Sequence, residues 1–507
     1  MTSQSHTDVI SQPAPAAGGG KSLRVFDSLE ILLLIAVIAC AVFTLLRAFI
    51  RIQLPFQIDY AEGAILNSSW RAAQGGGLYQ PLKGIPYQID PYPPFIYKVV
   101  GWVLARTGLN FFYPRLLAFA APVLACLLAA ILIHHWTQRW RVAVAFGFLP
   151  LSVVAVQSWL GIIRFDFIGI ALAMAGLVIF ALFPRYRFWS LPFFAVAVGG
   201  LYTLVAAPGA CCLHLWLKQE RKKSMLFGAC LAGALLAGVL YGQHTSSGWM
   251  NYHLFKTQHS PYSISQLASY SQGLLRGYAL LMLLSAVVIW KSIREHQVGL
   301  VALYWFLVLG TSLSLGKIGA AQNHVLQLIF AASLSAAVGY AWMRRKASGD
   351  SGLALILLTL TLTTASNVPL RPRKPMEDVS ECGRAYSTVR NDLGDRILSD
   401  NVGALVLARK PVFVSDPFVY RWMVAGTRFP DGDLRRMIDS REFTAIVLNH
   451  EAEGSITDDD RWPDDIRQTI SRNYLLKEEF TCKDARFVYQ PKSDVSSFPE
   501  KPPTTKQ

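Results

Sequence analysis

The chain has 507 residues, of which 52% are hydrophobic and only 16% are charged, and its mean hydropathy is +0.33. Soluble domains carry about 25% charged residues, so this composition excludes an ordinary soluble protein and indicates a membrane protein. The net charge of +15 does not indicate nucleic-acid binding, because acidic and basic residues nearly balance from residue 370 onward and the basic excess lies in the apolar part. Basic residues that flank membrane spans produce this distribution.

Residues 1–26 include "PAPAAGGG" and are predicted to form a disordered cytosolic tail. No small-residue cleavage site follows the first apolar run, so we interpret that run as an uncleaved span rather than a signal peptide. Crossing about 30 Å of hydrocarbon needs roughly 20 apolar residues. Eleven segments are candidate spans: 29–50, 113–133, 142–158, 166–183, 188–202, 204–217, 225–242, 275–290, 298–315, 323–342 and 352–368.

The weakest part of this count is 188–217, which could form one long or broken helix because Pro208 lies inside it. With a cytosolic N-terminus, eleven spans place five short, basic connections on the cytosolic side, as the positive-inside rule requires. A single span over 188–217 would put the basic segment "KQERKKS" outside and reverse every later loop. Eleven spans therefore fit better than ten, and they put the C-terminal region on the outer face.

Four segments on the predicted outer face carry polar and ionisable residues: 51–112, 158–167, 241–273 and 316–328. They are far apart in the sequence, but the predicted topology brings them to one boundary of the membrane. Burying an ionisable group unpaired at such a boundary costs several kcal/mol, so these groups suggest a functional site.

The first of these segments carries two acids three residues apart, Asp59 and Glu62. A helix starting here would place both on one face, although they could equally be solvated loop carboxylates or ordinary acids of a first helical turn. In the second segment, Asp166 precedes a long apolar run and would lie at the positive N-terminal end of that helix, as a cap, a site residue or both. Arg164 is then either its ion-pair partner or a phosphate clamp.

The third segment contains "NYHLF", with Tyr252 and His253, and the fourth contains Lys317. Lys317 could instead be an ordinary basic residue that flanks a membrane span and has no role in a site. Three further polar residues share one face of the tenth predicted span: Asn323, His324 and Gln327. A single histidine in this position is more often a structural hydrogen-bonding group than a catalyst.

After the transmembrane part, predicted over 27–368, residues 369–490 are predicted to form a small extracytoplasmic α/β domain. Its expected strands are 396–400, 411–416, 444–449 and 486–490, and 433–443 is expected to be an amphipathic helix. Residues 491–507 are predicted to be a disordered tail. Cys382 and Cys482 both fall in this domain, where an oxidising compartment would permit a disulfide, but the sequence leaves their pairing open.

Five stretches, in order, carry a resemblance to a known family: "DYAEGAILNSSWRAAQGGGLYQ" with the later "YPPFIYKVV", "RFDFIGIALAMAGL", "GWMNYHLF", "GKIGAAQNHVLQL" and "LSDNVGALVLARKPVFVSDPFVYRWM". They resemble the GT-C superfamily of polytopic glycosyltransferases, which includes protein O-mannosyltransferases, the aminoarabinose transferases of lipid A and bacterial multi-pass members. The resemblance covers most of residues 30–450. It implies an α-helical polytopic membrane protein with about eleven transmembrane helices, in a bacterial inner or plasma membrane.

The resemblance also implies a reaction, in which a sugar moves from a polyprenyl-phosphate donor to a lipid, glycan or protein acceptor on the outer face, with inversion. A base must take the proton of the acceptor hydroxyl, and we expect Asp59 in this role with Glu62 as the second choice. The phosphate leaving group needs cationic stabilisation, for which Arg164 and Lys317 are the candidates.

Further roles follow from the same resemblance. Asp166 would orient Arg164 or bind sugar hydroxyls, and Tyr252 and His253 would contribute to the acceptor side. Arg and Lys alone can serve a monophosphate leaving group, so we expect no essential metal or other cofactor, with Mg²⁺ as the alternative because two acids lie close together. The remaining donor-side candidates are Asn323, His324 and Gln327.

The sequence departs from the family in two places. Relatives usually carry a Thr-Lys-containing motif ahead of Ala-Ala-Pro, whereas "GLYTLVAAP" here has no lysine, and His324 and Gln327 replace the usual Tyr and Glu. These changes favour one alternative, a catalytically inactive scaffold. A transporter or lipid flippase is another alternative, but transporters place polar groups near the bilayer midplane, often in inverted repeats, and we find no such repeat in the sequence.

Overall fold

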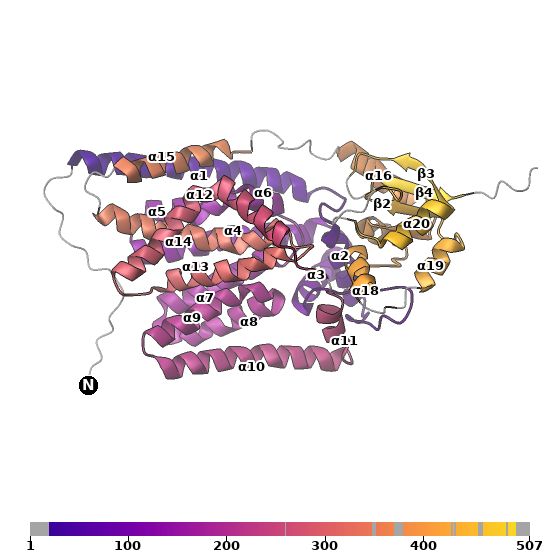
Figure 1. Cartoon of the computed structure of the whole chain (residues 1–507), viewed down its shortest axis with the longest axis horizontal. Helices are drawn as coiled ribbons and strands as arrows, with labels where there is room; N and C mark the ends of the chain where they lie inside the picture. Colours follow the sequence, from indigo (N-terminus) through magenta and orange to yellow (C-terminus); the bar gives the residue numbers. More distant parts are fainter. Residues whose placement is uncertain are drawn as a thin grey trace, which may run out of the picture.

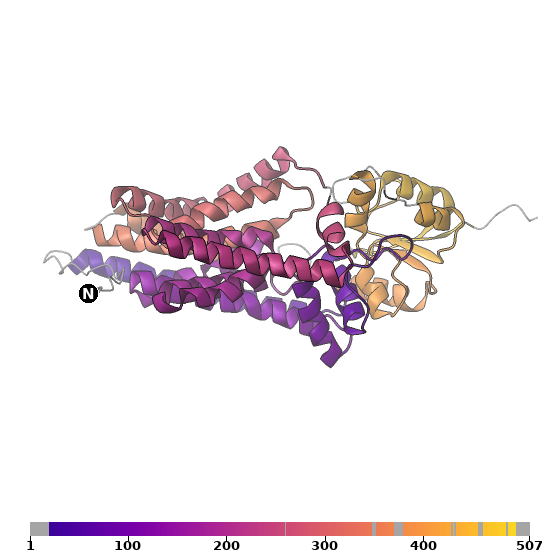
Figure 2. The same cartoon turned by 90° about the horizontal axis from the view of Figure 1, so that it is seen from below.

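The computed structural model describes residues 20–258, 260–346, 351–369, 379–426, 429, 432–454, 460–482 and 485–492. An elongated bundle of helices is joined at one end to a small α/β domain, and two perpendicular views show the same arrangement (Figures 1 and 2). Most of the predicted tails 1–26 and 491–507 lies outside the described residues. Residues 20–26, however, are helical, because α1 begins at Gly20.

The bundle is built of five long helices and several shorter ones. The long helices are α1 (Gly20–Ile52), α4 (Phe112–Thr137), α10 (Arg221–Thr245), α12 (Ile264–Arg294) and α14 (Leu326–Lys346). The shorter α-helices are α5 (Trp140–Phe148), α6 (Val154–Trp159), α7 (Asp166–Leu182), α8 (Leu191–Gly200), α9 (Ala206–Leu217), α11 (Trp249–Asn251), α13 (Leu300–Thr311) and α15 (Ser351–Ser366). Short 3₁₀ or π turns connect them: η1 (Leu149–Ser152), η2 (Pro184–Ser190), η3 (Tyr202–Val205), η4 (Tyr252–Lys256), η5 (Ser312–Gly316) and η6 (Gln322–Val325).

Helices occupy all eleven segments that the sequence marks as candidate spans. Among the described residues, five helices are long and apolar enough to cross a membrane, and five more apolar helices or helical runs are shorter. Large apolar side chains such as Ile35, Leu46 and Leu362 lie exposed on the outside of the bundle, as a lipid environment requires. The count of eleven spans stays a prediction.

The segment 188–217 forms two helices rather than one. α8 ends at Gly200, Leu201 is extended, and α9 begins after η3 with Pro208 in its first turn, where proline does not disturb helical hydrogen bonding. A Cβ on Gly200 would lie 2.1 Å from a ring carbon of Phe165, so this break allows the start of α7 to pack closely.

The segment 51–112, which we call the first outer loop after its predicted position, contains two helices, α2 (Tyr60–Ala73) and α3 (Pro94–Thr107). Both lie between the bundle and the α/β domain (Figure 1). The domain consists of α16 (Val379–Asn391), β1 (Ile397–Ser399), α17 (Val402–Leu407), α18 (Pro417–Gly426), α19 (Gly432–Asp439), β2 (Ala445–Leu448), α20 (Asp464–Asn473), β3 (Tyr474–Glu479) and β4 (Phe487–Pro491). Its sheet has the order β1-β2-β4-β3, in which only β1 and β2 are parallel. The strands predicted over 396–400, 444–449 and 486–490 are confirmed.

The strand predicted over 411–416 does not join this sheet. Instead, the segment runs along the first outer loop: the Tyr87 amide donates to the Phe413 carbonyl at 2.8 Å, and the Ser415 amide donates to the Tyr87 carbonyl at 3.1 Å. The Gln88 side chain adds a bond to the Val412 carbonyl at 2.9 Å. The backbone groups that a fifth strand would have offered to the sheet therefore hold the domain onto the bundle.

A disulfide between Cys382 and Cys482 closes the other side of the domain. It links α16 to the segment after β3, a strand that the sequence did not predict. The pairing that the sequence left open is thus formed.

Candidate functional site

Asp59 and Glu62 form the start of α2. The Asp59 carboxylate accepts a hydrogen bond from the Ala61 amide at 3.1 Å, and Glu62 accepts from the amides of Ile58 at 2.7 Å and Asp59 at 3.4 Å. This reciprocal arrangement is a capping box, the pattern that an acid followed three residues later by Glu favours. The helix start was thus predictable from the sequence, but the two carboxylates have different surroundings.

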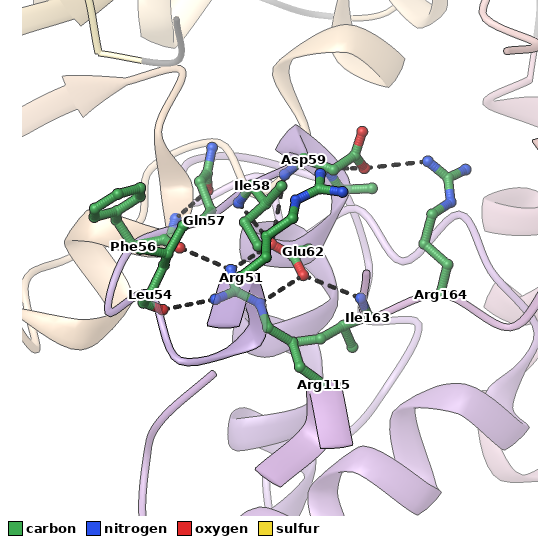
Figure 3. Close-up of polar contacts among 12 residues, drawn as sticks. Arg51, Leu54, Phe56, Gln57, Ile58, Asp59, Glu62, Arg115, Ile163 and Arg164 are labelled. Atoms are coloured by element: carbon green, nitrogen blue, oxygen red, sulfur yellow. Dashed lines mark hydrogen bonds and ion pairs between the residues drawn. The ribbon is translucent and has the colours of Figure 1, made fainter. Parts of the chain in front are cut away.

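Glu62 is fully buried and all its contacts are structural (Figure 3). Arg115 of α4 donates to both carboxylate oxygens, at 2.9 Å from Nε and 2.7 Å from Nη2. The Ile163 amide donates to the same carboxylate at 3.0 Å. Burial alone raises the pKa of Glu62, but Arg115 and the amide hydrogen bonds outweigh it and hold the pKa below its usual range.

This environment argues against Glu62 as a catalytic base, the second choice made from the sequence. Its carboxylate instead fixes three chain segments, because Arg115 also donates to the carbonyls of Leu54 at 2.6 Å and Phe56 at 2.7 Å. Sequence reasoning missed Arg115. The available signal was an arginine near the start of an apolar span, where a charge is retained only with a partner.

Arg164 is the centre of the second cluster. Its guanidinium contacts Asp59 at 3.2 Å and Asp166 at 3.4 Å, and it donates to the Tyr92 hydroxyl at 3.4 Å. The side chains of Arg164 and Asp59 remain 14% and 18% exposed, so this cluster is open to a ligand, unlike the Glu62 pair. Figure 3 shows the contact between Asp59 and Arg164 beside the Glu62 cluster.

The groups around Arg164 stabilise its positive charge. Burial alone lowers the pKa of Arg164, but interactions with Tyr92, Asp59 and Asp166 raise it by more. The net pKa lies well above the usual value, so the guanidinium stays charged. Burial raises the pKa of Tyr92 to about 12, so its phenol remains protonated. The ion pair between Arg164 and Asp166, one of the two alternatives from the sequence, is formed, and Asp59 joins it from another segment.

The donor-side candidates of the fourth outer segment meet Asp166 at a small cavity. Asn323 donates to the Asp166 carboxylate at 2.8 Å, and His324 shares a hydrogen bond with the Ser314 hydroxyl at 2.9 Å. The cavity is lined by Asp166, Ile170, Leu201, Thr203, Leu204, Asn323, His324 and Gln327. Thr203 belongs to the motif "GLYTLVAAP", so the segment that lacks the family's lysine faces this same cavity.

Lys317 lies at the edge of this arrangement. Its ammonium group is 3.5 Å from the Gln258 carbonyl, and burial lowers its pKa. Its charge acts on His324, as do those of Asp166 and Arg164, which places all four groups in one electrostatic environment. Within the described residues, no group of three His, Cys, Asp or Glu side chains could hold a metal ion.

His253 does not face a substrate. It is fully buried, its Nδ1 accepts from the Asp90 amide at 3.0 Å, and its Nε2 lies 2.8 Å from the Gln80 carbonyl. These partners require a neutral ring protonated on Nε2, and burial lowers its pKa accordingly. The prediction of His253 as an acceptor-side residue is therefore replaced by a structural role, while Tyr252 stays partly exposed and packs against Trp249 at 5.2 Å.

Two residues of the C-terminal α/β domain, which we call the outer domain after its predicted position, lie close to the same site and were not predicted. The Arg461 guanidinium lies 5.2 Å from the centre of the Tyr60 ring, next to Asp59 in the chain. Asp416 interacts electrostatically with Asp59, Arg164 and Arg461. The only signal for Asp416 was its place in the last stretch of the family resemblance.

No family model and no curated protein sequence matches the chain. The solved structure of ArnT from Cupriavidus metallidurans bound to undecaprenyl phosphate does match, with a TM-score of 0.56 over 93% of this chain and 98% of that chain at 10% identity. The apo structure of the same protein gives a TM-score of 0.52 at 11% identity, over 93% and 97% of the two chains. The chain therefore shares the fold of ArnT, and five helices among its described residues are long and apolar enough to cross a membrane.

Proposed function

We propose that the protein is a membrane glycosyltransferase that moves a sugar from a polyprenyl-phosphate donor to an acceptor on the outer face of a bacterial inner or plasma membrane, with inversion. One observation carries the proposal: Arg164 joins Asp59 and Asp166, which come from separate segments, at the start of α2, a helix that lies between the bundle and the α/β domain (Figure 1). The fold supports it, because one matching ArnT structure holds undecaprenyl phosphate.

The site suits a lipid-borne phosphate. The isoprenoid tail would stay in the bilayer, while the phosphate reaches the boundary where Arg164 and Lys317 lie. A planar guanidinium binds phosphate oxygens with two parallel hydrogen bonds, and Asp59 and Asp166 hold the guanidinium in a fixed orientation. Such fixed charges stabilise a leaving phosphate without reorganising during the reaction.

The sugar would lie against the cavity beside Asp166. Carboxylate, amide and imidazole groups that line this cavity are suited to sugar hydroxyls, and Asn323 fixes the Asp166 carboxylate at 2.8 Å. Asp59, which the sequence suggests as the base, lies 3.2 Å from Arg164, the residue proposed to bind the phosphate. Arg and Lys supply the positive charge in this scheme, so we propose that chelation of divalent metals leaves activity unchanged.

The test uses purified protein in lipid nanodiscs and in sealed vesicles, with a panel of radiolabelled polyprenyl-phosphate sugars. A membrane extract from a strain that lacks the protein supplies the acceptor. Transfer of label to the extract supports the enzyme. Labelled lipid crossing sealed vesicles without transfer would instead identify a flippase, and binding without turnover would identify a scaffold.

A further inference from the structure

Asp416 follows the segment that holds the outer domain onto the first outer loop. The preceding residue, Ser415, forms two side-chain hydrogen bonds with the Ile89 backbone, accepting from its amide at 2.7 Å and donating to its carbonyl at 3.0 Å. These bonds come in addition to the backbone pairing with Tyr87. The position of Asp416 is therefore fixed relative to the loop that carries Asp59, rather than only relative to its own domain.

The two carboxylate oxygens of Asp416 have different surroundings. One accepts a hydrogen bond from the Val419 amide at 3.0 Å and so caps α18. The other is buried and has no hydrogen-bond partner among the described residues, although the residue is only 1% exposed. A buried, unsatisfied carboxylate oxygen costs folding free energy, so its retention calls for a functional reason.

The segment that starts at Asp416 packs against two parts of the candidate site. The Phe418 ring lies 5.8 Å from the Tyr60 ring at the start of α2. It also covers Gly319, in the turn that follows Lys317, where an added Cβ would lie 2.6 Å from the Phe418 ring. Phe418, two residues after Asp416, thus lies between the element that follows Asp59 and the turn that follows Lys317.

Charged groups around Asp416 come from every neighbouring element. Arg461 of the outer domain and Arg164 of the bundle attract its negative charge, whereas Asp59 repels it. Asp416 in turn affects the phenols of Tyr60 and Tyr92, both of which lie next to Arg164. The unpartnered oxygen is therefore in the electrostatic environment of the phosphate clamp.

On the basis of the proposed transferase function, we propose that Asp416 is the carboxylate that accepts the proton of the acceptor hydroxyl, and that Asp59 orients Arg164. The acceptor oxygen forms a bond to the anomeric carbon while the bond from that carbon to the phosphate oxygen breaks. The bonding electrons leave with the polyprenyl phosphate, which Arg164 and Lys317 stabilise. The hydroxyl proton passes to the oxygen of Asp416 that has no hydrogen-bond partner among the described residues.

Two observations favour Asp416 over Asp59 for this step. The Asp59 carboxylate is paired with Arg164 at 3.2 Å and bound by the Ala61 amide at 3.1 Å, both through the same oxygen, so it is already engaged in orienting Arg164 and capping α2. Burial, by contrast, raises the pKa of Asp416 to about 6, although the Val419 amide, Arg461 and Arg164 oppose the shift. A base is most effective when its pKa lies near the working pH.

The test compares Asp416→Asn with Asp59→Asn in the transfer assay, across about pH 5–8. Asparagine keeps the oxygen that caps α18, so the substitution removes the base without removing the cap. Asp464→Asn, an exposed change in α20 of the same domain, is the matched control and is expected to transfer sugar at the wild-type rate. Binding of undecaprenyl phosphate is measured for every variant.

For the wild type, the rate should rise with pH through about 6 and then stay level, because Asp416 must be ionised to accept a proton. Asp416→Asn should reduce kcat by about 10²-fold or more, abolish this pH dependence and bind undecaprenyl phosphate normally. Asp416→Glu should recover part of the rate. Asp59→Asn should bind undecaprenyl phosphate more weakly but keep the rise near pH 6 in its residual activity.

Wild-type activity in Asp416→Asn, or loss of the pH dependence in Asp59→Asn instead, would overturn the role of Asp416 and leave the transferase proposal intact. If the wild type transfers none of the labelled sugars, the transferase proposal fails and the role of Asp416 fails with it. The two failures are therefore distinguishable by the wild-type reaction alone.

Discussion

Two ion pairs lie three residues apart at the start of α2, one between Glu62 and Arg115 and one between Asp59 and Arg164. In the first pair both side chains are completely buried, and backbone groups occupy the remaining hydrogen-bonding positions. In the second pair both side chains retain some exposure, and Arg164 is shared with a second acid. The two acids of one capping box therefore differ in their surroundings. The pair of Glu62 and Arg115 is completely buried, whereas the pair of Asp59 and Arg164 stays partly exposed.

The largest effect is expected from Glu62→Gln. Removing one partner of a buried ion pair leaves the Arg115 charge uncompensated, which should lower the free energy of unfolding by about 3–5 kcal/mol. Thermal unfolding in detergent, followed by fluorescence, measures the change. The double variant Glu62→Gln with Arg115→Met should recover part of the loss. An unchanged melting temperature in Glu62→Gln would remove the structural side of the comparison.

Asp59→Asn is expected to have the opposite profile. Asparagine still caps α2, so the melting temperature should change little, whereas transfer should fall by about 10²–10³-fold because Arg164 loses one of the two carboxylates that orient it. The same preparation is used for melting and for transfer of labelled sugar. Full activity in this variant would exclude Asp59 from the mechanism.

Arg164→Lys tests whether the open cluster needs a guanidinium or only a positive charge. Lysine cannot contact Asp59 and Asp166 together with one planar group, so transfer should fall by about 10- to 100-fold, which corresponds to one charged hydrogen bond. Undecaprenyl phosphate binding should weaken in parallel. If Arg164→Lys binds and transfers normally, a point charge is sufficient and the guanidinium geometry is irrelevant.

The smallest expected effect is on the pH dependence of stability. The pKa of Glu62 is lower in the folded protein than in the unfolded chain, so its contribution to stability is fully present above the ordinary glutamate pKa of 4.5 and is lost as the pH falls through the folded pKa. The stability difference between wild type and Glu62→Gln should therefore be constant at neutral pH and shrink in acid. Melting curves at a series of pH values measure it, and a difference that grows in acid would contradict the assignment.

Several elements were predictable because their signals are local. Every apolar segment that was predicted as a span contains a helix, because the length and composition that suit lipid are properties of the segment itself. A helix start at Asp59 was one of the alternatives that the sequence offered and is the one that α2 shows, and the position of Asp166 before an apolar run predicted the start of α7. In each case the interacting groups lie within a few residues of one another.

Other features were not predictable because they depend on distant partners. The segment 411–416 has the composition of a strand, and only the fold shows that it pairs with the first outer loop instead of the sheet. His253 looked like a substrate-facing residue until the fold placed Asp90 and Gln80 against it. Arg115 and Asp416 were overlooked, since the value of a single charge depends on what surrounds it.

The sequence by itself determined that the chain is apolar and helical, which apolar segments form helices, and which segments carry the ionisable groups of the site. Tertiary structure alone decided that Glu62 is closed by Arg115 while Asp59 shares an open Arg164, and that Asp416 joins them from the outer domain. The physical reason is that helix formation depends on neighbours in the chain, whereas the charge state and accessibility of a carboxylate depend on burial and on partners far away in the sequence.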